Sequence, residues 1–430
     1  MSGSLSVHPT AGTPAVAARS VYSSACPYDN RLSSPPMTAP DDRTPQPFAF
    51  ATATAALVTV FAASGAPIPL YERYRAAARL STQDLSLAAV AYFVAVLIAL
   101  VVLGRLSDHL GRRVVAVAAV ILAAIGSLIL LDVSNLGILL TGRVFHGLAC
   151  GLASSALTTY VIDTAPDRPR WLAAGAAAGG PVSGLTIGSL GTGALAQYAP
   201  APLAATYVID VGLLAVCAVL LLFAHDPVNR RQGALTSLRP RVSIPAAVRP
   251  LLPGAVAVFG ATWALGGFYQ AFSPTIAARD LGTTNTLVAA VVFASFMAPY
   301  ALGGPLTARL TPSVAQRAGI VVFAVAVVGI ATSLLAGSTL GVIAFGVIAG
   351  AAQGMTFTGS VRALLSKTAR GERAGLMSAV YLFSYCGAAA PSLVAGRLSS
   401  IVALPHIAFG YAAIAAVSAV VTVRTSRAER

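Results

Sequence analysis

Two charged residues lie inside long apolar runs of this sequence, where they could bind a substrate or a proton. Arg143 and Asp210 lie well inside such runs, each roughly 10 Å from one end of its run if the run is helical. A charge at the middle of a bilayer is costly, so such residues normally face the protein interior or a watery path. We expect Arg143 and Asp210 to pair if their helices touch, or to meet a substrate or a proton.

A histidine follows Arg143 by three residues and therefore lies near the same face of a helix. This residue, His146, belongs to the one side-chain type that ordinarily titrates near physiological pH. We place His146 in the same candidate substrate or proton pathway. Its alternative role is that of a hydrogen-bonded histidine packed between helices.

Neutral polar and aromatic side chains form a second candidate set, Tyr269, Gln270, Gln353, Tyr381 and Tyr385. The last two are spaced i, i+4, which puts them on one face of a helix. A few polar groups among aromatic rings suit an amphipathic organic molecule. Hydrogen bonding between helices is the alternative for each residue.

The elements that position these residues are apolar stretches near the length of about 20 residues that a helix needs to cross a bilayer. The chain is 57% hydrophobic and 10% charged, whereas soluble domains carry about 25% charged residues. The sequence therefore predicts an all-α membrane protein with twelve transmembrane helices. These lie near residues 48–70, 85–104, 114–131, 136–162, 171–196, 203–224, 251–272, 287–307, 318–336, 340–361, 374–396 and 407–423.

The longest internal polar stretch, residues 225–250, divides these helices six and six. We expect an N-terminal bundle over 48–224, a cytoplasmic linker over 225–250 and a C-terminal bundle over 251–424. With the N-terminus inside, inner segments hold 22 Lys and Arg residues and outer segments hold 5. This asymmetry predicts that both termini are cytoplasmic in a multi-pass protein of the plasma membrane.

The first 47 residues contain eight prolines and no apolar core segment. They do not read as a signal peptide, and we expect residues 1–47 to form a disordered cytoplasmic tail. Residues 425–430 form a second short tail. Because Met37 offers a second start close to the first helix, we hypothesise that residues 1–36 are dispensable.

A glycine-anchored turn, Gly104-Arg-Leu-Ser-Asp-His-Leu-Gly-Arg-Arg113, follows the second apolar run, and a shorter copy begins 200 residues later at Gly304. Small residues let the backbone turn tightly. We expect Asp108 to accept hydrogen bonds from the N-terminus of a neighbouring helix. Arg112 and Arg113 are expected to hold lipid phosphates or carboxylates.

This turn resembles the helix 2–3 signature of the major facilitator superfamily, G-x-L-x-D-[RK]-x-G-[RK]-[RK]. The matching residues are Gly104, Leu106, Asp108, Gly111, Arg112 and Arg113. His109 departs from the pattern, and in the second copy Ala308 stands where the acid would be. The resemblance implies two pseudo-symmetric six-helix bundles that this loop helps to lock together on the cytoplasmic side.

Glycines at regular spacing give further resemblances and predict close helix packing. Gly147 and Gly151 resemble the helix 4 segment of that family, and Gly350 and Gly354 repeat their spacing 203 residues on. Gly180, Pro181 and Gly184 are similar to part of its antiporter signature, from which Ala176 and Leu185 depart.

These resemblances imply a secondary transporter that moves a small organic solute by alternating access, without a cofactor or a metal. Proton-coupled efflux of an amphipathic compound is the expected activity, and import or facilitated passage of a sugar-like or other small metabolite is the alternative. The net charge of +14 sets orientation rather than nucleic-acid binding. We expect contacts with membrane lipids, a monomer and no enzymatic activity, since clustered catalytic groups and a Walker A pattern are absent from the sequence.

Overall fold

The structure of this protein, a computed structural model, describes residues 46–169, 171–228, 232–238 and 242–425. Among these residues the secondary structure is helical and contains no strand. The predicted tail 1–47 lies almost entirely outside the described residues, as do the hypothesis on residues 1–36 and most of the tail 425–430.

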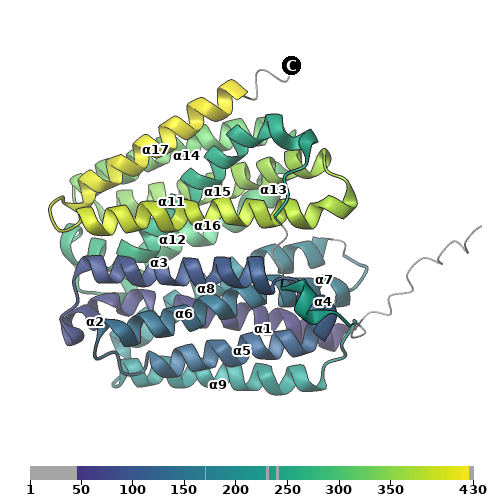
Figure 1. The fold of residues 1–430 in the computed structure, drawn as a ribbon. Coiled ribbons are helices and arrows are strands. Elements are labelled where there is room, and N and C mark those ends of the chain that lie inside the picture. The colour runs from purple at the N-terminus through teal and green to yellow at the C-terminus, as the bar shows by residue number, and fades with distance from the viewer. Residues whose placement is uncertain (1–45, 170, 229–231, 239–241, 426–430) are drawn as a thin grey trace, which may run out of the picture. The chain divides into compact units, whose positions relative to one another are not determined.

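The first bundle holds six long helical segments, several of them interrupted by a short turn of 3₁₀ or π-helix (Figure 1). They are α1 (Pro47–Gly65) with η1 (Ile68–Leu70) and α2 (Tyr71–Ala78); α3 (Thr82–Ile98) with η2 (Ala99–Leu103); α4 (Ser107–Leu110) with α5 (Arg112–Ile129); α6 (Leu136–Leu152) with η3 (Ala153–Leu157) and α7 (Thr158–Thr164); α8 (Trp171–Tyr198); and α9 (Pro202–Phe223).

The second bundle repeats this plan after the short linker helix α10 (Ala234–Ser237). Its segments are η4 (Ala246–Leu251) with α11 (Leu252–Thr275) and η5 (Ile276–Asp280); α12 (Thr286–Met297) with η6 (Ala298–Leu302) and α13 (Gly303–Thr307); α14 (Pro312–Leu335); α15 (Thr339–Ser366); η7 (Arg370–Glu372) with α16 (Arg373–Leu398); and α17 (Leu404–Thr425).

The prediction of twelve membrane helices in two bundles is confirmed. Within the described residues, 11 helical segments are long and apolar enough to cross a membrane, and the glycine-rich α8, with 28 residues, is the remaining long helix. The predicted ends are less accurate, because polar residues continue several helices past their apolar core. The first segment, predicted to end at residue 70, continues through α2 to Ala78.

Polar residues placed just before the apolar runs start several helices by capping their N-termini. Ser81 and Asp84 form a capping box at α3, while Asn135 and Ser338 accept the N–H groups of Ile138 and Gly341 at the starts of α6 and α15. These caps satisfy donors that the first turn of a helix leaves unpaired. Asn135 and Ser338 lie 203 residues apart in the sequence, which is the spacing that also relates the two glycine pairs.

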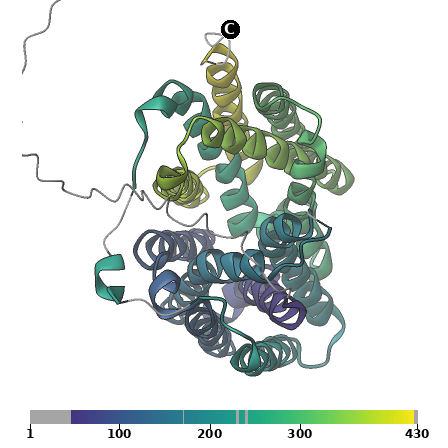
Figure 2. The same cartoon turned by 90° about the vertical axis from the view of Figure 1, so that its right-hand side faces the viewer.

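The interface between the bundles obeys a pseudo-two-fold symmetry. Helix α3 packs against α16, and α8 packs against α12. The repeat of about 200 residues carries α3 onto α12 and α8 onto α16, so each contact is the image of the other. Figure 1 shows α3 and α16 running side by side across this interface, and Figure 2 shows the two helix groups end-on.

Three hydrogen bonds between described residues cross this interface. Ser86 Oγ donates to Ser392 O at 2.6 Å, Thr275 Oγ1 donates to Glu72 Oε1 at 2.6 Å, and Thr286 N donates to the Gln197 side chain at 3.2 Å. All three lie toward the end of the bundles that the sequence predicts to face outward. At the other end, α7 packs against α1, α5, α8 and η3 of its own bundle.

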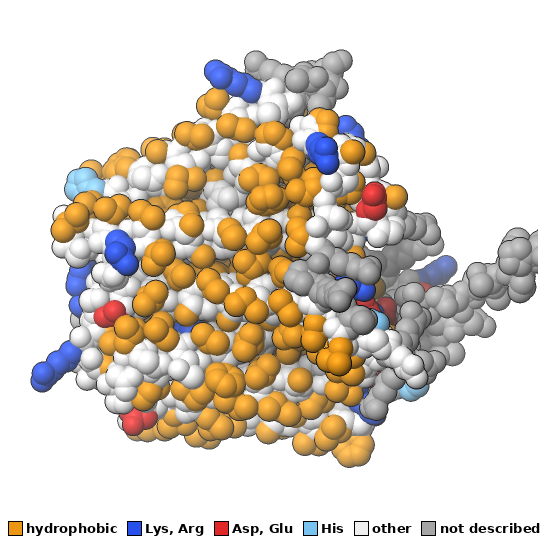
Figure 3. Space-filling model, in the orientation of Figure 1, with side chains coloured by type: hydrophobic (Ala, Val, Ile, Leu, Met, Phe, Trp, Pro, Cys, Tyr) orange, Lys and Arg blue, Asp and Glu red, His pale blue; other side chains and the backbone are white. Residues whose placement is uncertain are grey.

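The surface agrees with a lipid environment. In Figure 3 hydrophobic side chains cover the broad middle of the visible face, and charged side chains gather toward its left and right edges. Large apolar side chains, such as those of Val325, Val417 and Leu222, are more than half exposed on the surface of the helical body. In water such a surface would drive aggregation, whereas in a bilayer it is the solvated face.

Candidate functional site

The turn between α3 and α5 is built around a glycine that no other residue could replace without strain. Gly111 has φ +95°, a conformation that side chains with a Cβ rarely adopt. The space that a Cβ would fill is occupied by the carboxylate of Asp226. Gly104, at the other end of the turn, lies where a Cβ would meet the carbonyl oxygen of Leu100.

The carboxylate of Asp226 caps the N-terminus of α5. Its Oδ1 accepts the backbone N–H of Arg112 at 3.1 Å, and its Oδ2 accepts that of Arg113 at 3.2 Å. A carboxylate is favoured there by unpaired amides and by the helix dipole. The expectation that Asp108 accepts from a helix N-terminus is therefore wrong. Asp226 stands close enough to do so, whereas Asp108 lies one turn before Arg112 and meets its guanidinium.

The Arg112 side chain is the centre of the turn's ion pairs. Its Nη1 lies 2.5 Å from Asp108 Oδ1 and 2.7 Å from Ser107 Oγ, and its Nε lies 3.2 Å from Asp163 Oδ2 on α7. Arg113 Nη1 donates to the carbonyl of Leu222 at 3.2 Å, near the end of α9. Arg112 thus holds carboxylates, as predicted, and Arg113 holds a helix C-terminus.

These contacts tie the turn to its own bundle and to the start of the linker. Tyr160 Oη donates to His225 O at 2.5 Å, and His109 Nδ1 lies 3.2 Å from Gln232 O. In this conformation the turn fixes α3, α5, α7 and α9 relative to one another. The lock between bundles that the resemblance implies stays a prediction for another conformation.

Arg143 on α6 is fully buried and largely uncompensated. Its Nη1 donates to Ser64 O on α1 at 2.8 Å, and its guanidinium carbon lies 4.5 Å from the centre of the Tyr92 ring on α3. Its Nε and Nη2 are buried without a hydrogen-bond partner among the described residues. A cation–π contact offsets part of the cost of burying this charge.

The hypothesised pair between Arg143 and Asp210 does not form. Asp210 lies on α9, its Oδ2 is buried without a hydrogen-bond partner among the described residues, and no salt bridge between described residues includes it. The physical reason is packing: α9 lies against α1, α5 and α8, while α6 lies chiefly against α3 and α5. The two charges are therefore separate features of one bundle.

His146 faces α5 rather than the interface between bundles. Its Nε2 lies 3.2 Å from Ser127 Oγ, and its ring fills the space beside Gly126. The side chain is fully buried. This is the geometry of the packing histidine that the sequence left open as an alternative.

Aromatic side chains form a continuous cluster from Arg143 across the interface of the bundles. Phe93 contacts Tyr385 with ring centres 6.2 Å apart, and Tyr385 meets Trp263 edge-on at 4.7 Å. We call this set the interface aromatic cluster, and its members are Tyr92, Phe93, Phe259, Trp263, Tyr300, Phe357, Tyr381 and Tyr385. They come from α3, α11, η6, α15 and α16, so both bundles contribute.

The remaining predicted residues lie deeper in the second bundle. Tyr269 stacks on Phe296 at 4.9 Å and is fully buried between α11 and α12. Gln270 is also buried. Gln353 precedes Phe357 by one helical turn on α15, and its Oε1 is buried without a partner among the described residues. The structure thus brings Gln353, Tyr381 and Tyr385 to the interface aromatic cluster, and it places Tyr269 behind it.

The predicted packing glycines lie at close helix crossings. Gly147 and Gly151 meet the backbone of α3 near Tyr92 and Val96, and Gly180 and Gly184 meet α1. Pro181 stands within α8 between the last two. Gly350 and Gly354 meet the backbone of α12 and η6 in the second bundle. Because a Cβ at these positions would overlap neighbouring atoms, small residues are what allow the helices to approach.

Comparison with known proteins assigns the family. Residues 48–276, more than half of the chain, match the model of the Major Facilitator Superfamily. The chain belongs to this superfamily. This membership is the ground on which we infer transport of a small solute across a membrane.

One solved structure and two curated relatives illustrate the likeness. The nucleoside transporter NupG matches with a TM-score of 0.67 over 88% of this chain and 99% of that one, at 12% identity, which shows the shared fold alone. Monosaccharide-sensing protein 2 of Arabidopsis thaliana is 38% identical over 69 residues, which are 16% of this chain and 10% of that protein. Glucose transporter GlcP of Staphylococcus epidermidis is 40% identical over 67 residues, 16% of this chain and 15% of that one. These matches span far less than two thirds of either relative.

Proposed function

We propose that this transporter exports a small amphipathic organic compound with an aromatic or other flat apolar part, in exchange for protons. The observation that carries the proposal is the interface aromatic cluster. Its rings come from both bundles and lie where the bundles must part for alternating access. Rings that separate when the bundles rock apart offer a flat apolar surface to a solute, and Gln353 and the Tyr381 hydroxyl add polar groups beside it.

Arg143 is the residue that we assign to the polar part of the solute or to the coupling step. Its guanidinium ends the aromatic cluster at Tyr92, and two of its nitrogens lack partners among the described residues. A buried donor left without a partner is costly, so it is available to an acceptor on the solute. We assign Asp210, the other charge inside a helix, to proton movement, and we assign His146 to the packing of α5 on α6.

In the conformation of the described residues, the two bundles are in contact toward the predicted outer face. The hydrogen bonds between Glu72 and Thr275 and between Ser86 and Ser392 join the bundles at that end. The turn at Gly104–Arg113 makes its hydrogen bonds and ion pairs with the first bundle and with the start of the linker. We therefore assign this conformation to the inward-facing stage, with both termini cytoplasmic, in a monomer of the plasma membrane, and with bundles over 48–224 and 251–424.

Transport by purified protein in vesicles tests this proposal. Inside-out vesicles are loaded with the protein, an aromatic fluorescent cation such as ethidium is added outside, and a pH gradient is imposed. We expect ethidium uptake into these vesicles that collapses when the gradient is dissipated. Ethidium movement that does not depend on the pH gradient would contradict proton exchange. If neither ethidium nor related aromatic compounds move, the export proposal is wrong.

The second candidate is uptake or facilitated passage of a sugar-like solute. It is favoured by the names of two relatives, a glucose transporter and a monosaccharide-sensing protein. Counterflow of radiolabelled glucose in the same vesicles distinguishes the two. Trans-stimulated glucose entry without a pH gradient would favour this candidate over export.

A further inference from the structure

Among the described residues, Arg309 and Arg362 of the second bundle form no ion pair, whereas Arg112 of the first bundle does. From Leu281 to Gly371 the sequence contains no Asp or Glu, yet it contains Arg309, Arg317, Arg362, Lys367 and Arg370. In the first bundle, Arg112 is held between Asp108 and Asp163. The two halves therefore differ in charge at the same predicted membrane face.

The internal repeat shows which acids are missing. At the spacing of the two glycine turns, Ala308 takes the position of Asp108. At the spacing of the α6 and α15 glycines, Ser366 takes the position of Asp163, and Arg362 lies one turn before it. The second bundle thus has the neutral residues Ala308 and Ser366 where the first has two carboxylates, and Arg362 lies one turn away from Ser366.

The positively charged side chain of Arg362, on α15, contacts the C-terminal end of α13. Its Nη1 donates to Thr307 O at 3.0 Å, and Leu310 O lies 3.5 Å away. Arg309 belongs to the same turn, and both arginines are exposed. The turn after α13 therefore carries the guanidinium of Arg309 and accepts hydrogen bonds from that of Arg362 on α15.

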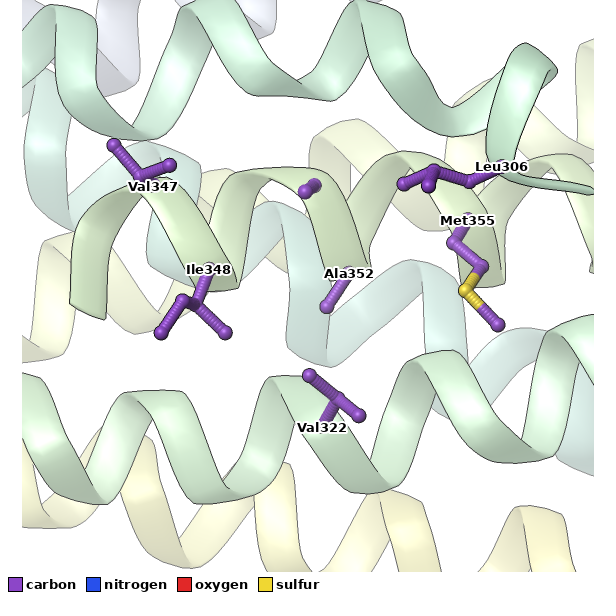
Figure 4. A pocket seen from close by; sticks show the side chains of 7 residues that line it. Leu306, Val322, Val347, Ile348, Ala352 and Met355 are labelled. Atoms are coloured by element: carbon purple, nitrogen blue, oxygen red, sulfur yellow. The ribbon is translucent and has the colours of Figure 1, made fainter. Parts of the chain in front are cut away.

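An apolar groove of about 260 Å³ on the outside of the bundle ends at this turn. The side chains that line it come from α13, α14 and α15, and Figure 4 shows how they lie. Its lining residues are Leu306, Val322, Val347, Ile348, Ala351, Ala352 and Met355. Leu306 adjoins Thr307, to which Arg362 donates, and Met355 lies two turns before Arg362 on the same face of α15.

We propose that this groove and the two arginines bind an anionic phospholipid. The acyl chain lies along the groove and the phosphate lies between Arg309 and Arg362. There it takes the place that Asp108 and Asp163 take beside Arg112 in the first bundle. Arginines at a membrane surface attract anionic headgroups, and the groove removes the acyl chain from competition with bulk lipid. The site is lateral, on α13–α15, and shares no residue with the interface aromatic cluster.

Lipid binding to the purified full-length chain tests the proposal by native mass spectrometry. Phosphatidylglycerol and phosphatidylcholine with the same acyl chains are compared in one detergent. We expect wild-type protein to prefer phosphatidylglycerol, and R309Q/R362Q to bind it roughly 25-fold more weakly, since each arginine at a membrane surface contributes roughly fivefold. R309K/R362K keeps both charges and is expected to keep most of the preference. The groove-filling A351F is expected to weaken both lipids.

Two matched controls test whether the effect is specific to this site rather than a result of net charge or of filling any apolar groove. R397Q/R424Q removes two exposed arginines elsewhere on the second bundle, and A91F fills the apolar groove between α3 and α6 on the first bundle. Neither is expected to change the preference for phosphatidylglycerol. Thermal unfolding of each variant in lipid-free detergent shows that it is folded.

Three results would overturn the proposal. Equal binding of phosphatidylglycerol and phosphatidylcholine by wild-type protein would show that the site does not recognise an anionic headgroup. Equal loss in R309Q/R362Q and R397Q/R424Q would make the effect one of net charge. Binding of glycerol phosphate as tight as that of phosphatidylglycerol would make this a site for a soluble phosphate.

Discussion

The Asp226 carboxylate accepts the backbone N–H of Arg112 at 3.1 Å, so a residue three positions after the end of α9 fixes the first turn of α5. The same carboxylate fills the space that a side chain at Gly111 would need. Helix capping, a left-handed glycine and the linker to the second bundle therefore meet at one atom group. Asp226 therefore connects the start of the linker to the turn whose Arg112 contacts Asp163 on α7.

Replacing Asp226 with Asn tests this cap. We expect Asn to lose about 0.3–1 kcal/mol of stability, because it keeps an acceptor oxygen but not the charge that the helix N-terminus favours, and we expect Ala to lose about 1 kcal/mol or more. The measurement is thermal unfolding of the purified protein in detergent. Asp132→Asn, at an exposed position in the loop before α6, is the matched control and is expected to unfold like wild type. An Asp226 variant as stable as this control would mean that the cap contributes nothing.

Replacing Gly111 with Ala tests the strain at the turn. The positive φ costs about 1–2 kcal/mol for a residue with a Cβ, and the new methyl would displace Asp226. Gly212→Ala in α9 is the control, because a Cβ there meets no atom within 4 Å; it is expected to stabilise the helix by up to about 1 kcal/mol. Opposite signs for the two substitutions in thermal unfolding are the expected result, and a stabilised G111A would contradict it.

The glycine turn and the number of membrane helices could be predicted because both depend on local sequence. Apolar length alone identifies a membrane helix, and the residue types at Gly104 to Arg113 define the turn. The role of Asp226 could not be predicted from the sequence, because Asp226 lies 114 residues from Arg112 and stands outside both the turn and the apolar runs. Its place three residues after the end of α9 is the signal that could have singled it out.

The interface aromatic cluster could be predicted only in part. Tyr381 and Tyr385 were recognised from their spacing, whereas Tyr92, Phe93 and Phe357 look like ordinary members of membrane helices. Lipid and protein interior are similarly apolar, so sequence pattern does not tell which side of such a helix faces its neighbours. The failed pairing of Arg143 with Asp210 has the same cause, since the pairing depended on which helices touch.

Tyr385 is the member of the cluster at which both bundles meet, so its ring should matter to solute affinity. Replacing it with Leu removes the contacts with Phe93 and Trp263, and an aromatic contact is worth about 0.5–1.5 kcal/mol. We expect the KM for an aromatic solute to rise about two- to tenfold, with Tyr385→Phe close to wild type. Phe272→Leu, in the same second bundle but outside the cluster, is the control. A KM unchanged in Y385L would remove this ring from the solute site.

Arg143 should be required for transport but not for folding. A charge inside a membrane helix costs about 3 kcal/mol on insertion scales, and two nitrogens of Arg143 lack hydrogen-bond partners among the described residues. We expect Arg143→Ala to unfold at the same temperature as wild type or higher, while transport is lost. Arg143→Lys keeps the charge but loses the planar group over Tyr92, and we expect a partial loss. Intact transport in R143A would remove Arg143 from the mechanism.

The hydrogen bond between Glu72 and Thr275 should help hold the predicted outer end closed. Glu72→Ala removes the acceptor, whereas Glu72→Gln keeps an oxygen for Thr275. A cysteine at Ser392, which is fully buried between α3 and α16, reports opening through its reaction with an impermeant thiol reagent, in a background that carries Cys386→Ser. Loss of a partly buried bond of about 1 kcal/mol should raise labelling of S392C about fivefold in E72A and leave E72Q near wild type. Equal labelling in the two variants would show that this bond does not set the conformational balance, and labelling solely from the cytoplasmic side would reverse the orientation assigned to the chain.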